Sequence, residues 1–361
     1  MTKIKAAVCH AFNEPMVIQE VDLRAPQAGE VEVSIEAVAV CHSDISLWQG
    51  GFGGSTPAVF GHEAAGIVTG LGAGVKGLAL GDSVAVTLIR ACGTCPSCGS
   101  GHPTVCENPG DGKNSPLATD QGDAMWQALF TGAFAEKVVV DQSQLVKIPA
   151  DMPKDAAALI SCGVITGVGA AVNTANIRPG QNVVVIGAGG VGLNAIQGAR
   201  IAGAARIVAV DTNPDKLEAA KEFGATHGVL AEGKPFKEAQ KIFGGRGADA
   251  VLVTVGVAAV YDLAPRYLAN RGKVVMVGMP HFGQMASYSP LLMADMGQSI
   301  VGSKMGDVVI KRDIPWMVDL YTQGRLKLDE LITGRWPLEQ INEAMADTIA
   351  GNARRNVIII K

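Results

Sequence analysis

Residues Asn182–Arg200 read NVVVIGAGGVGLNAIQGAR and contain the most informative pattern in the chain. Their first part, Val183–Ile186, is aliphatic throughout, which predicts a strand buried on both faces. A glycine-rich turn of the form G-x-G-x-x-G follows, and Leu193, Ile196 and Ala199 then recur at helical spacing. A strand before this turn and a helix after it are the context of a dinucleotide-binding site. The segment therefore predicts a doubly wound α/β domain with a bound dinucleotide.

The glycines of this turn have separate functions in the expected complex. Gly187 permits the tight turn, Gly189 lets the backbone approach a pyrophosphate, and Gly192 lets the helix pack against the strand. With Gly190 and Val191 they bring the helix N-terminus to the phosphates, where its N–H groups and partial positive charge favour an anion.

An acidic residue follows at the expected distance. Asp211 ends a second apolar strand, Arg206–Val210, and lies 24 residues after Gly187. Its carboxylate can accept hydrogen bonds from the adenosine ribose hydroxyls and would repel a 2′-phosphate. The sequence therefore predicts NAD rather than NADP as the cofactor.

The composition is that of a well-packed soluble globule, since 48% of the 361 residues are hydrophobic and 18% are charged. The net charge is −4 without a basic run, so we expect neither nucleic acid nor an anionic membrane as a partner. The longest apolar run, Val183–Leu193, is too short to span a bilayer. The first residues, MTKIKAAVCHAF, lack the apolar core of a secretory signal, and we expect a cytoplasmic protein.

Two patterns of secondary structure divide the chain. Residues 1–163 contain short alternating runs separated by Gly, Pro and Asp, which predicts a β-rich domain of the barrel or sandwich kind. Residues 164–303 alternate strands with helices and include six candidate parallel strands, the number in a complete Rossmann sheet. Residues 304–361 end in an apolar strand, and we expect this tail to rejoin the first domain.

Four of the seven cysteines lie in one loop, as Cys92-x2-Cys95-x2-Cys98-x7-Cys106. In a chain without a secretory signal this crowding favours metal ligation over disulfides. Four thiolates suit a closed, tetrahedral, structural zinc site. An iron–sulfur cluster is the alternative, although the x7 gap fits a ferredoxin-type run poorly.

A second candidate metal site is scattered along the chain. It consists of Cys41 in CHSD, His62 in FGHEAAG and Cys162 in SCGVITG. Each residue alone is ambiguous, because a single buried cysteine usually acts as a small hydrophobe and a single histidine as a satisfied polar group. Together they offer two sulfurs and one nitrogen with a fourth position open, the ligand set of a catalytic zinc in alcohol dehydrogenases.

The motifs together resemble those of zinc-dependent alcohol dehydrogenases of the medium-chain dehydrogenase/reductase superfamily. The most specific is Gly61-His62-Glu63-x2-Gly66-x5-Gly72, supported by the cysteine loop and the glycine-rich turn. The resemblance covers essentially the full length. It implies a chaperonin-10-like β domain closed by the C-terminal segment, an NAD-binding Rossmann domain, and two zinc ions per chain, one catalytic and one structural.

The resemblance also assigns roles around the catalytic zinc, which would lower the pKa of a bound alcohol so that hydride can pass to nicotinamide. Ser43 would take the hydroxyl proton, Asp44 would accept the second ring N–H of His62, and Glu63 would lie behind the metal. Many members have a histidine five residues after the first zinc cysteine, where this chain has Ser46. A serine can pass a proton on but cannot store one, so the end of the proton relay differs here.

Further cofactor contacts follow from the same resemblance. The implied residues, besides the glycine-rich turn and Asp211, are His42 and Arg355 at the pyrophosphate, Lys216 at the ribose, Thr166 and Val191 at the nicotinamide, and Val277–Met279 at its carboxamide. The register at Arg355 is open by one position, because Arg354 precedes it.

Residues near the family's pocket positions are apolar or aromatic, which favours a hydrophobic or aromatic alcohol or aldehyde. They are Trp48, Phe52, Leu88, Trp126, Leu129 and Met279. The alternatives are a nicotinoprotein that keeps its NAD, a polyol dehydrogenase, and a non-catalytic nucleotide-binding relative. Members of the family usually pair through the last strand of the nucleotide sheet, near Ser299–Ser303, so we expect a homo-oligomer, either a dimer or a tetramer.

Overall fold

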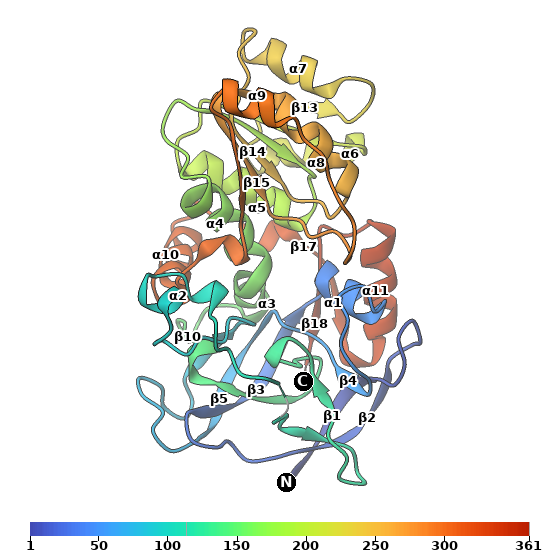
Figure 1. Cartoon of the computed structure of the whole chain (residues 1–361). Coiled ribbons are helices and arrows are strands. Elements are labelled where there is room, and N and C mark those ends of the chain that lie inside the picture. Colours follow the sequence, from blue (N-terminus) through green and yellow to red (C-terminus); the bar gives the residue numbers. More distant parts are fainter. Residues whose placement is uncertain (113, 361) are drawn as a thin grey trace. The chain divides into compact units, whose positions relative to one another are not determined.

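A computed structural model of the chain describes residues 1–112 and 114–360, and it divides into two compact units (Figure 1). The β-rich unit consists of Met1–Cys162, Val309–Gly324 and Leu328–Lys361. The α/β unit consists of Gly163–Val308 and Arg325–Lys327.

The α/β unit is built on a six-stranded parallel sheet with the strand order β13-β12-β11-β14-β15-β16. This is the doubly wound order in which the strand before the glycine-rich turn lies at the centre. The strands are β11 (Asn182–Ile186), β12 (Arg206–Asp211), β13 (His227–Leu230), β14 (Ala248–Val253), β15 (Leu268–Met276) and β16 (Ser299–Gly302). The helices between them are α5 (Gly190–Ile201), α6 (Pro214–Glu222), α7 (Pro235–Ile242), α8 (Ala258–Leu263) and α9 (Pro290–Asp295).

The β-rich unit contains two sheets. The larger has the order β10-β6-β5-β3-β18-β17, with β9 also paired to β3, and the smaller has the order β7-β2-β1-β4-β8. The larger sheet comprises β3 (Glu30–Ala39), β5 (Ala64–Leu71), β6 (Ser83–Val86), β9 (Lys137–Asp141), β10 (Leu145–Lys147), β17 (Ile332–Pro337) and β18 (Arg355–Ile359). The smaller comprises β1 (Thr2–Cys9), β2 (Val17–Leu23), β4 (Ala58–Val59), β7 (Leu117–Ala118) and β8 (Trp126–Gln127).

The last strand closes the larger sheet. β18 pairs antiparallel with β3 and parallel with β17, so it lies inside the sheet rather than at its edge. Two helices accompany this tail, α10 (Ile310–Thr322) and α11 (Ile341–Ala350). The expected return of the C-terminal residues to the β-rich part is therefore what the contacts show.

The division of the chain differs from the predicted boundary at residue 304. Residues 304–308 and Arg325–Lys327 belong to the α/β unit. Gly306 lies so close to α4 (Ile165–Gly169) that a Cβ on it would stand 2.4 Å from the carbonyl oxygen of Ile165. The backbone of Lys327 exchanges two hydrogen bonds with the side chain of Gln197 in α5. These contacts, invisible in the residue pattern, place both segments in the α/β unit.

One helical stretch, Lys154–Thr174, is long and apolar enough to cross a membrane by length and composition, but 89% of its most apolar window is buried inside the protein. It consists of α3 (Lys154–Leu159), a π-helical turn at Ile160–Val164, α4, and a second π-helical turn at Ala170–Thr174. Its burial is that of a core helix.

Candidate active site and metal centres

Four buried side chains of the β-rich unit meet at one point. Cys41, His62, Glu63 and Cys162 each offer a ligand atom, and these atoms all lie within 4.8 Å of one another. The three predicted ligands of a catalytic zinc are thus brought together, although the first and the last, Cys41 and Cys162, are 121 residues apart in the sequence. The arrangement is compatible with a single ion held by two sulfurs and an imidazole.

Local structure explains how each ligand reaches this point. Cys41 follows β3 and is the N-cap of α1 (His42–Trp48), and its sulfur accepts the N–H of Ser43 at 3.5 Å. His62 lies in the short extended segment before β5. Cys162 lies in the π-helical turn, which is a frequent backbone feature of functional sites. Ser161 in that turn donates to the carbonyl oxygen of Ala64, which ties the turn to β5.

The imidazole of His62 is oriented for metal binding. Its Nδ1 lies 2.9 Å from Oδ1 of Asp44, so the carboxylate accepts the Nδ1–H and Nε2 keeps its lone pair. The ring is fully buried, and Nε2 has no hydrogen-bond partner among the residues that the structure describes. A buried nitrogen without a partner is costly, and a metal ion at this position would satisfy it. The donor set therefore fits zinc.

The two thiols of this cluster differ in acidity. A hydrogen bond from Cys162 lowers the pKa of Cys41 well below its usual value, against the opposing effect of burial. The same contact, together with burial, raises the pKa of Cys162. The two pKa shifts have opposite directions, and because a thiol must be deprotonated to bind a metal, metal binding here would release protons.

Glu63 and Arg355 form a buried ion pair next to the cluster. Glu63 is fully buried, and Arg355, the first residue of β18, is 7% exposed. Burial raises the pKa of Glu63 to about 8, although the Arg355 charge opposes the rise. The pyrophosphate role of Arg355 stays a prediction, since the ion pair with Glu63 is the contact that the structure shows.

The second group of ligands is the cysteine loop. Cys92, Cys95, Cys98 and Cys106 also lie with their sulfurs within 4.8 Å of one another. Backbone N–H groups point at these sulfurs, from Cys95 to Cys92 at 3.3 Å and from Cys98 to Cys95 at 3.4 Å. The amides of Thr94 and Cys95 lower the pKa of Cys92 to about 6. Burial, in contrast, raises the pKa of Cys98 to about 12, so this thiol would lose its proton on metal binding. Four gathered sulfurs with N–H groups directed at them fit a structural zinc.

The glycine-rich turn of the α/β unit has the predicted geometry. Gly187 has φ 96°, a left-handed conformation that favours glycine. A Cβ on Gly192 would stand 1.8 Å from the carbonyl oxygen of Gly187, so only glycine fits there. At Gly189 a Cβ would meet no described atom within 4 Å, which leaves the backbone open to a ligand. Asp211 accepts the N–H of Ala188 at 2.7 Å, which places the acidic side chain beside the turn.

Two family models match the chain, "Alcohol dehydrogenase GroES-like domain" over residues 27–150 and "Zinc-binding dehydrogenase" over residues 190–323. Alcohol dehydrogenase-like 1 of Arabidopsis thaliana is 35% identical, covering 98% of this chain and 95% of that protein. The NDMA-dependent alcohol dehydrogenase of Amycolatopsis methanolica is 34% identical, with 99% of each covered. The chain belongs to the zinc-dependent alcohol dehydrogenases of the medium-chain dehydrogenase/reductase superfamily.

Solved structures support the same assignment for this alcohol dehydrogenase. A zinc-binding alcohol dehydrogenase domain protein from Burkholderia ambifaria has a TM-score of 0.95 at 34% identity, covering 100% of this chain and 99% of the other. The benzyl alcohol dehydrogenase of Acinetobacter calcoaceticus has a TM-score of 0.94 at 30% identity, covering 100% of both. The predicted fold class, a chaperonin-10-like domain plus a Rossmann domain, is confirmed.

The other predicted site residues of this alcohol dehydrogenase are spread over both units. In α1, His42 is exposed, whereas Ser43 and Ser46 are half-buried. In the α/β unit, the hydroxyl of Thr166 donates to the sulfur of Met305 at 3.6 Å. Lys216 and Val191 are half-buried, Val277 is buried and Met279 is exposed. Within each unit these positions are compatible with their predicted roles, which remain predictions.

Sequence reasoning missed how Glu63 is neutralised. Arg355 was assigned to the cofactor, and nothing in its neighbourhood, Arg354-Arg355-Asn356, distinguishes a buried arginine from an exposed one. A usable signal was the position of Arg355 at the start of the final apolar strand. A strand that re-enters the sheet beside β3 brings its first residue close to the residues around Cys41.

Proposed function

We propose that this alcohol dehydrogenase transfers hydride between a hydrophobic, in particular aromatic, alcohol and NAD at a zinc ion held by Cys41, His62 and Cys162. The observation that carries the proposal is the buried, unpartnered Nε2 of His62 next to two thiols. Bound zinc would supply Lewis acidity that favours the alkoxide form of the alcohol.

Nearby side chains would accept the proton of the alcohol and orient the metal ligands. Asp44 holds the tautomer of His62, as its 2.9 Å contact indicates. Ser43 follows the first ligand and is half-buried, which suits the role of accepting the alcohol proton. Ser46 would continue the relay one helical turn later without storing the proton. Glu63 would lie behind the metal, and its charge is balanced by Arg355.

The four-cysteine loop would hold a second, structural zinc, giving two zinc ions per chain. Its four sulfurs leave no ligand position for a substrate, because a tetrahedral ion accepts four donors. Support comes from the gathered sulfurs and the backbone N–H groups directed at them. An equivalent of zinc that resists chelators after the catalytic zinc is lost would meet this expectation.

The cofactor would be NAD, bound by the glycine-rich turn with the acidic side chain of Asp211 at the adenosine ribose. His42, Lys216, Thr166 and Val277–Met279 are the further proposed contacts. One relative is named an NDMA-dependent alcohol dehydrogenase. This name is a reason to test the nicotinoprotein alternative, in which NAD stays bound to the protein instead of exchanging. Cofactor that co-elutes with the protein in gel filtration would support that alternative.

An apolar substrate is favoured by side chains of the β-rich unit. Trp48, Phe52, Trp126 and Leu129 are partly buried and pack against the core that also contains Phe60, two residues before His62. A structural neighbour at 30% identity is named benzyl alcohol dehydrogenase, which agrees with an aromatic alcohol. Polyols have no apolar surface to bury in such surroundings.

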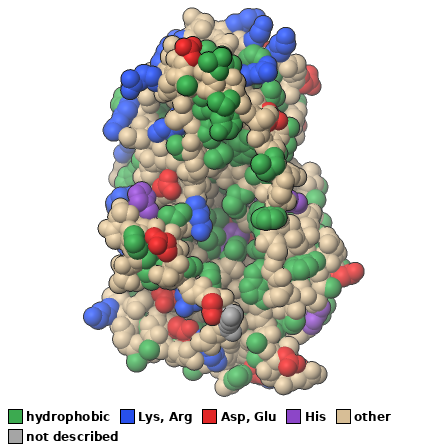
Figure 2. Space-filling model, in the orientation of Figure 1, with side chains coloured by type: hydrophobic (Ala, Val, Ile, Leu, Met, Phe, Trp, Pro, Cys, Tyr) green, Lys and Arg blue, Asp and Glu red, His purple; other side chains and the backbone are tan. Residues whose placement is uncertain are grey.

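We also propose that the protein is a cytoplasmic homo-oligomer that pairs through β16. This strand is the last in the sheet order, and an open edge is a template for pairing. The connection between β15 and β16 contains exposed apolar side chains, of which Phe282 is 98% and Met285 85% exposed. Hydrophobic side chains also gather over the upper part of the face in Figure 2, where Figure 1 places α9. Sedimentation at several concentrations distinguishes monomer, dimer and tetramer.

The direct test is a panel of alcohols and aldehydes followed by NADH absorbance. We expect benzylic alcohols to have a higher kcat/KM than sorbitol, and comparable values would contradict the apolar substrate class. Cys41→Ser should abolish turnover while leaving NAD binding to the α/β unit intact. Retained turnover in Cys41→Ser would overturn the assigned ligand set, and loss of NAD binding would point to misfolding instead.

A further inference from the structure

The turn Ala128–Gly132 has an unusual backbone. Leu129 has φ 51° and Phe130 has φ 57°, and Gly132 is also left-handed at φ 57°. Two successive non-glycine residues with positive φ are rare, because the Cβ atom disfavours this region. Such backbone persists where the surrounding structure holds it, and it clusters at ligand-binding sites. Contacts from outside the turn must therefore hold its backbone in this conformation.

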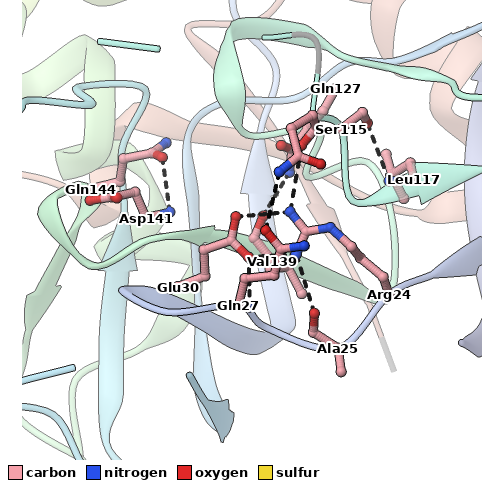
Figure 3. Close-up of polar contacts among 11 residues, drawn as sticks. Arg24, Ala25, Gln27, Glu30, Ser115, Leu117, Gln127, Val139, Asp141 and Gln144 are labelled. Atoms are coloured by element: carbon pink, nitrogen blue, oxygen red, sulfur yellow. Dashed lines mark hydrogen bonds and ion pairs between the residues drawn. The ribbon is translucent and has the colours of Figure 1, made fainter. Parts of the chain in front are cut away.

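The first constraint is the side chain of Gln127, at the start of the turn. Its Nε2 donates to the carbonyl oxygen of Thr131 at 2.9 Å and to that of Val139 in β9 at 3.0 Å. The amide thus spans the turn and attaches it to the larger sheet (Figure 3). A methyl group at Gly132 would stand 3.0 Å from Cγ of Gln127, so the two residues are closely packed.

The second constraint is Gln144, which is fully buried. Its Nε2 donates to the carbonyl oxygen of Phe130 at 3.0 Å and to that of Thr87 at 2.9 Å. Its Oε1 accepts the N–H of Asp141 at 3.2 Å, a contact drawn in Figure 3. One buried amide therefore joins the turn to the segment that follows β6, where Leu88 comes directly after Thr87.

The turn lies beside the residues that lead to His62. Before the turn, β8 pairs with β4 through Val59 and Gln127. After the turn, the N–H of Ala133 donates to the carbonyl oxygen of Gly61 at 2.8 Å. The five residues of the turn are thus enclosed between two contacts with the segment that immediately precedes the histidine ligand. The partly buried side chain of Leu129 packs on the same core as Trp126.

We propose that Gln144 and Gln127 are positioning residues that set the apolar wall of the substrate site. They hold the Leu129 turn in its left-handed form, and Gln144 fixes the Leu88 segment against it. The inference rests on the proposed function, since it assumes that Leu88 and Leu129 face an alcohol bound at the Cys41–His62–Cys162 metal. The glutamines touch neither substrate nor metal and act through the backbone that carries the two leucines.

The test is Gln144→Met, which keeps the length of the side chain but removes both donors and the acceptor. Its matched control is Gln197→Met in the α/β unit. Gln197 is also fully buried, its Nε2 donates to Asn194 and Lys327, and its Oε1 accepts the N–H of Lys327. Both variants lose a buried amide that makes three hydrogen bonds, so both should lose comparable thermal stability.

Only the substrate preference should distinguish the two variants. For Gln144→Met we expect the ratio of kcat/KM for benzyl alcohol to that for ethanol to fall about 10-fold, mainly through KM, because an apolar wall contributes differential binding. Gln197→Met should leave this ratio unchanged. Amide hydrogen exchange of residues 129–132 should become faster in Gln144→Met and stay unchanged in Gln197→Met.

If Gln144→Met does not fold, Gln127→Met is the second test, because Gln127 is half-buried and bonds the same turn. It should also lower the ratio of kcat/KM for benzyl alcohol to that for ethanol. An unchanged ratio in an active, folded Gln144→Met or Gln127→Met would overturn the positioning role. A wild-type protein that oxidises no alcohol of the panel would overturn the proposed function, and this inference with it. The two failures are therefore distinguishable by the wild-type activity.

Discussion

Oδ1 of Asp44 lies 2.9 Å from Nδ1 of His62 and also accepts the N–H of Gly61 at 3.0 Å. The other oxygen accepts the N–H of Cys41 at 3.2 Å. One buried carboxylate thus orients the imidazole ligand and contacts the two chain segments that carry Cys41 and His62. Its effect should therefore be measurable as metal affinity.

Asp44→Asn should weaken binding of the catalytic zinc by about 10- to 100-fold, because the imidazole loses its carboxylate and the Cys41 N–H loses an acceptor. The measurement is the rate and extent of zinc transfer to a chelator, with the retained equivalent assigned to the cysteine loop. Asp22→Asn is the control, since the side chain of Asp22, among the residues that the structure describes, forms an ion pair only with the exposed Lys3. Equal zinc retention in the two variants would contradict the role of Asp44.

Cys106→Ser should lower the zinc content from about two to about one ion per chain and reduce thermal stability, because a structural site needs all four thiolates. The metal content of purified protein measures the first effect and a melting curve the second. Cys9→Ala is the control, since Cys9 is buried in β1 outside both ligand groups. A Cys106→Ser protein with an unchanged metal content would argue against the structural site.

Arg24 and Glu30 give a prediction for pH. Burial raises the pKa of Glu30, but the hydrogen bonds from Arg24 and from the backbone of Gln27, with the charges of Arg24 and Arg90, outweigh this effect and lower the pKa. Nη1 and Nη2 of Arg24 donate to the two oxygens of the Glu30 carboxylate, at 2.5 and 2.9 Å (Figure 3). A lowered pKa stabilises the fold above the unfolded value of about 4.3, and this stability is lost as the pH falls through the folded value.

Arg24→Met should therefore lower the free energy of unfolding by about 1–3 kcal/mol near pH 7. The difference from wild type should shrink as the pH falls below about 4, where Glu30 is protonated in both states. Lys3→Met removes an exposed ion pair with Asp22 and should change stability by less than about 1 kcal/mol. Denaturant curves at several pH values measure how the difference in free energy of unfolding between wild type and Arg24→Met depends on pH. A difference that grows as the pH falls would contradict a lowered pKa of Glu30 in the folded state.

Gly54 and Gly53 form a matched pair for backbone strain and packing. Gly54 has φ 115°, and a Cβ there would stand 2.3 Å from Cζ3 of the Trp126 ring. Gly53 has φ 73°, with no described atom within 4 Å of its Cβ position. Gly53→Ala should lower the free energy of unfolding by about 1–2 kcal/mol through backbone strain alone. Gly54→Ala should lower it by about 1–3 kcal/mol more through the clash with the indole. In a Trp126→Ala background the part of the extra cost that comes from the clash should vanish, and an unchanged difference between the two glycine variants would exclude the indole as its cause.

The parts of the site that could be predicted are those with local rules. Gly187, Gly189 and Gly192 were found because the turn has a fixed spacing between a strand and a helix. The cysteine loop was found because its ligands are neighbours in sequence. The Cys41–His62–Cys162 set came from the family resemblance, since no periodicity relates residues so far apart.

What could not be predicted depends on long-range packing. The π-helical turn at Cys162 is invisible in an apolar segment that reads as a regular helix. The left-handed backbone at Leu129 and Phe130 contradicts their residue types and exists because Gln127 and Gln144 hold it. Short strands such as β4 and β8 contain two residues each, too few to show a period.

The position of β18 inside the larger sheet has a consequence for biosynthesis. The ribosome completes residues 163–308 before it delivers Arg355–Ile359, so the α/β unit can fold while the β-rich sheet still lacks an internal strand. Until then the Ala37–Ala39 part of β3 lacks its partner strand, and Glu63 lacks the guanidinium of Arg355. Nascent chains stalled before residue 355 are therefore the species that chaperones would need to shield from aggregation.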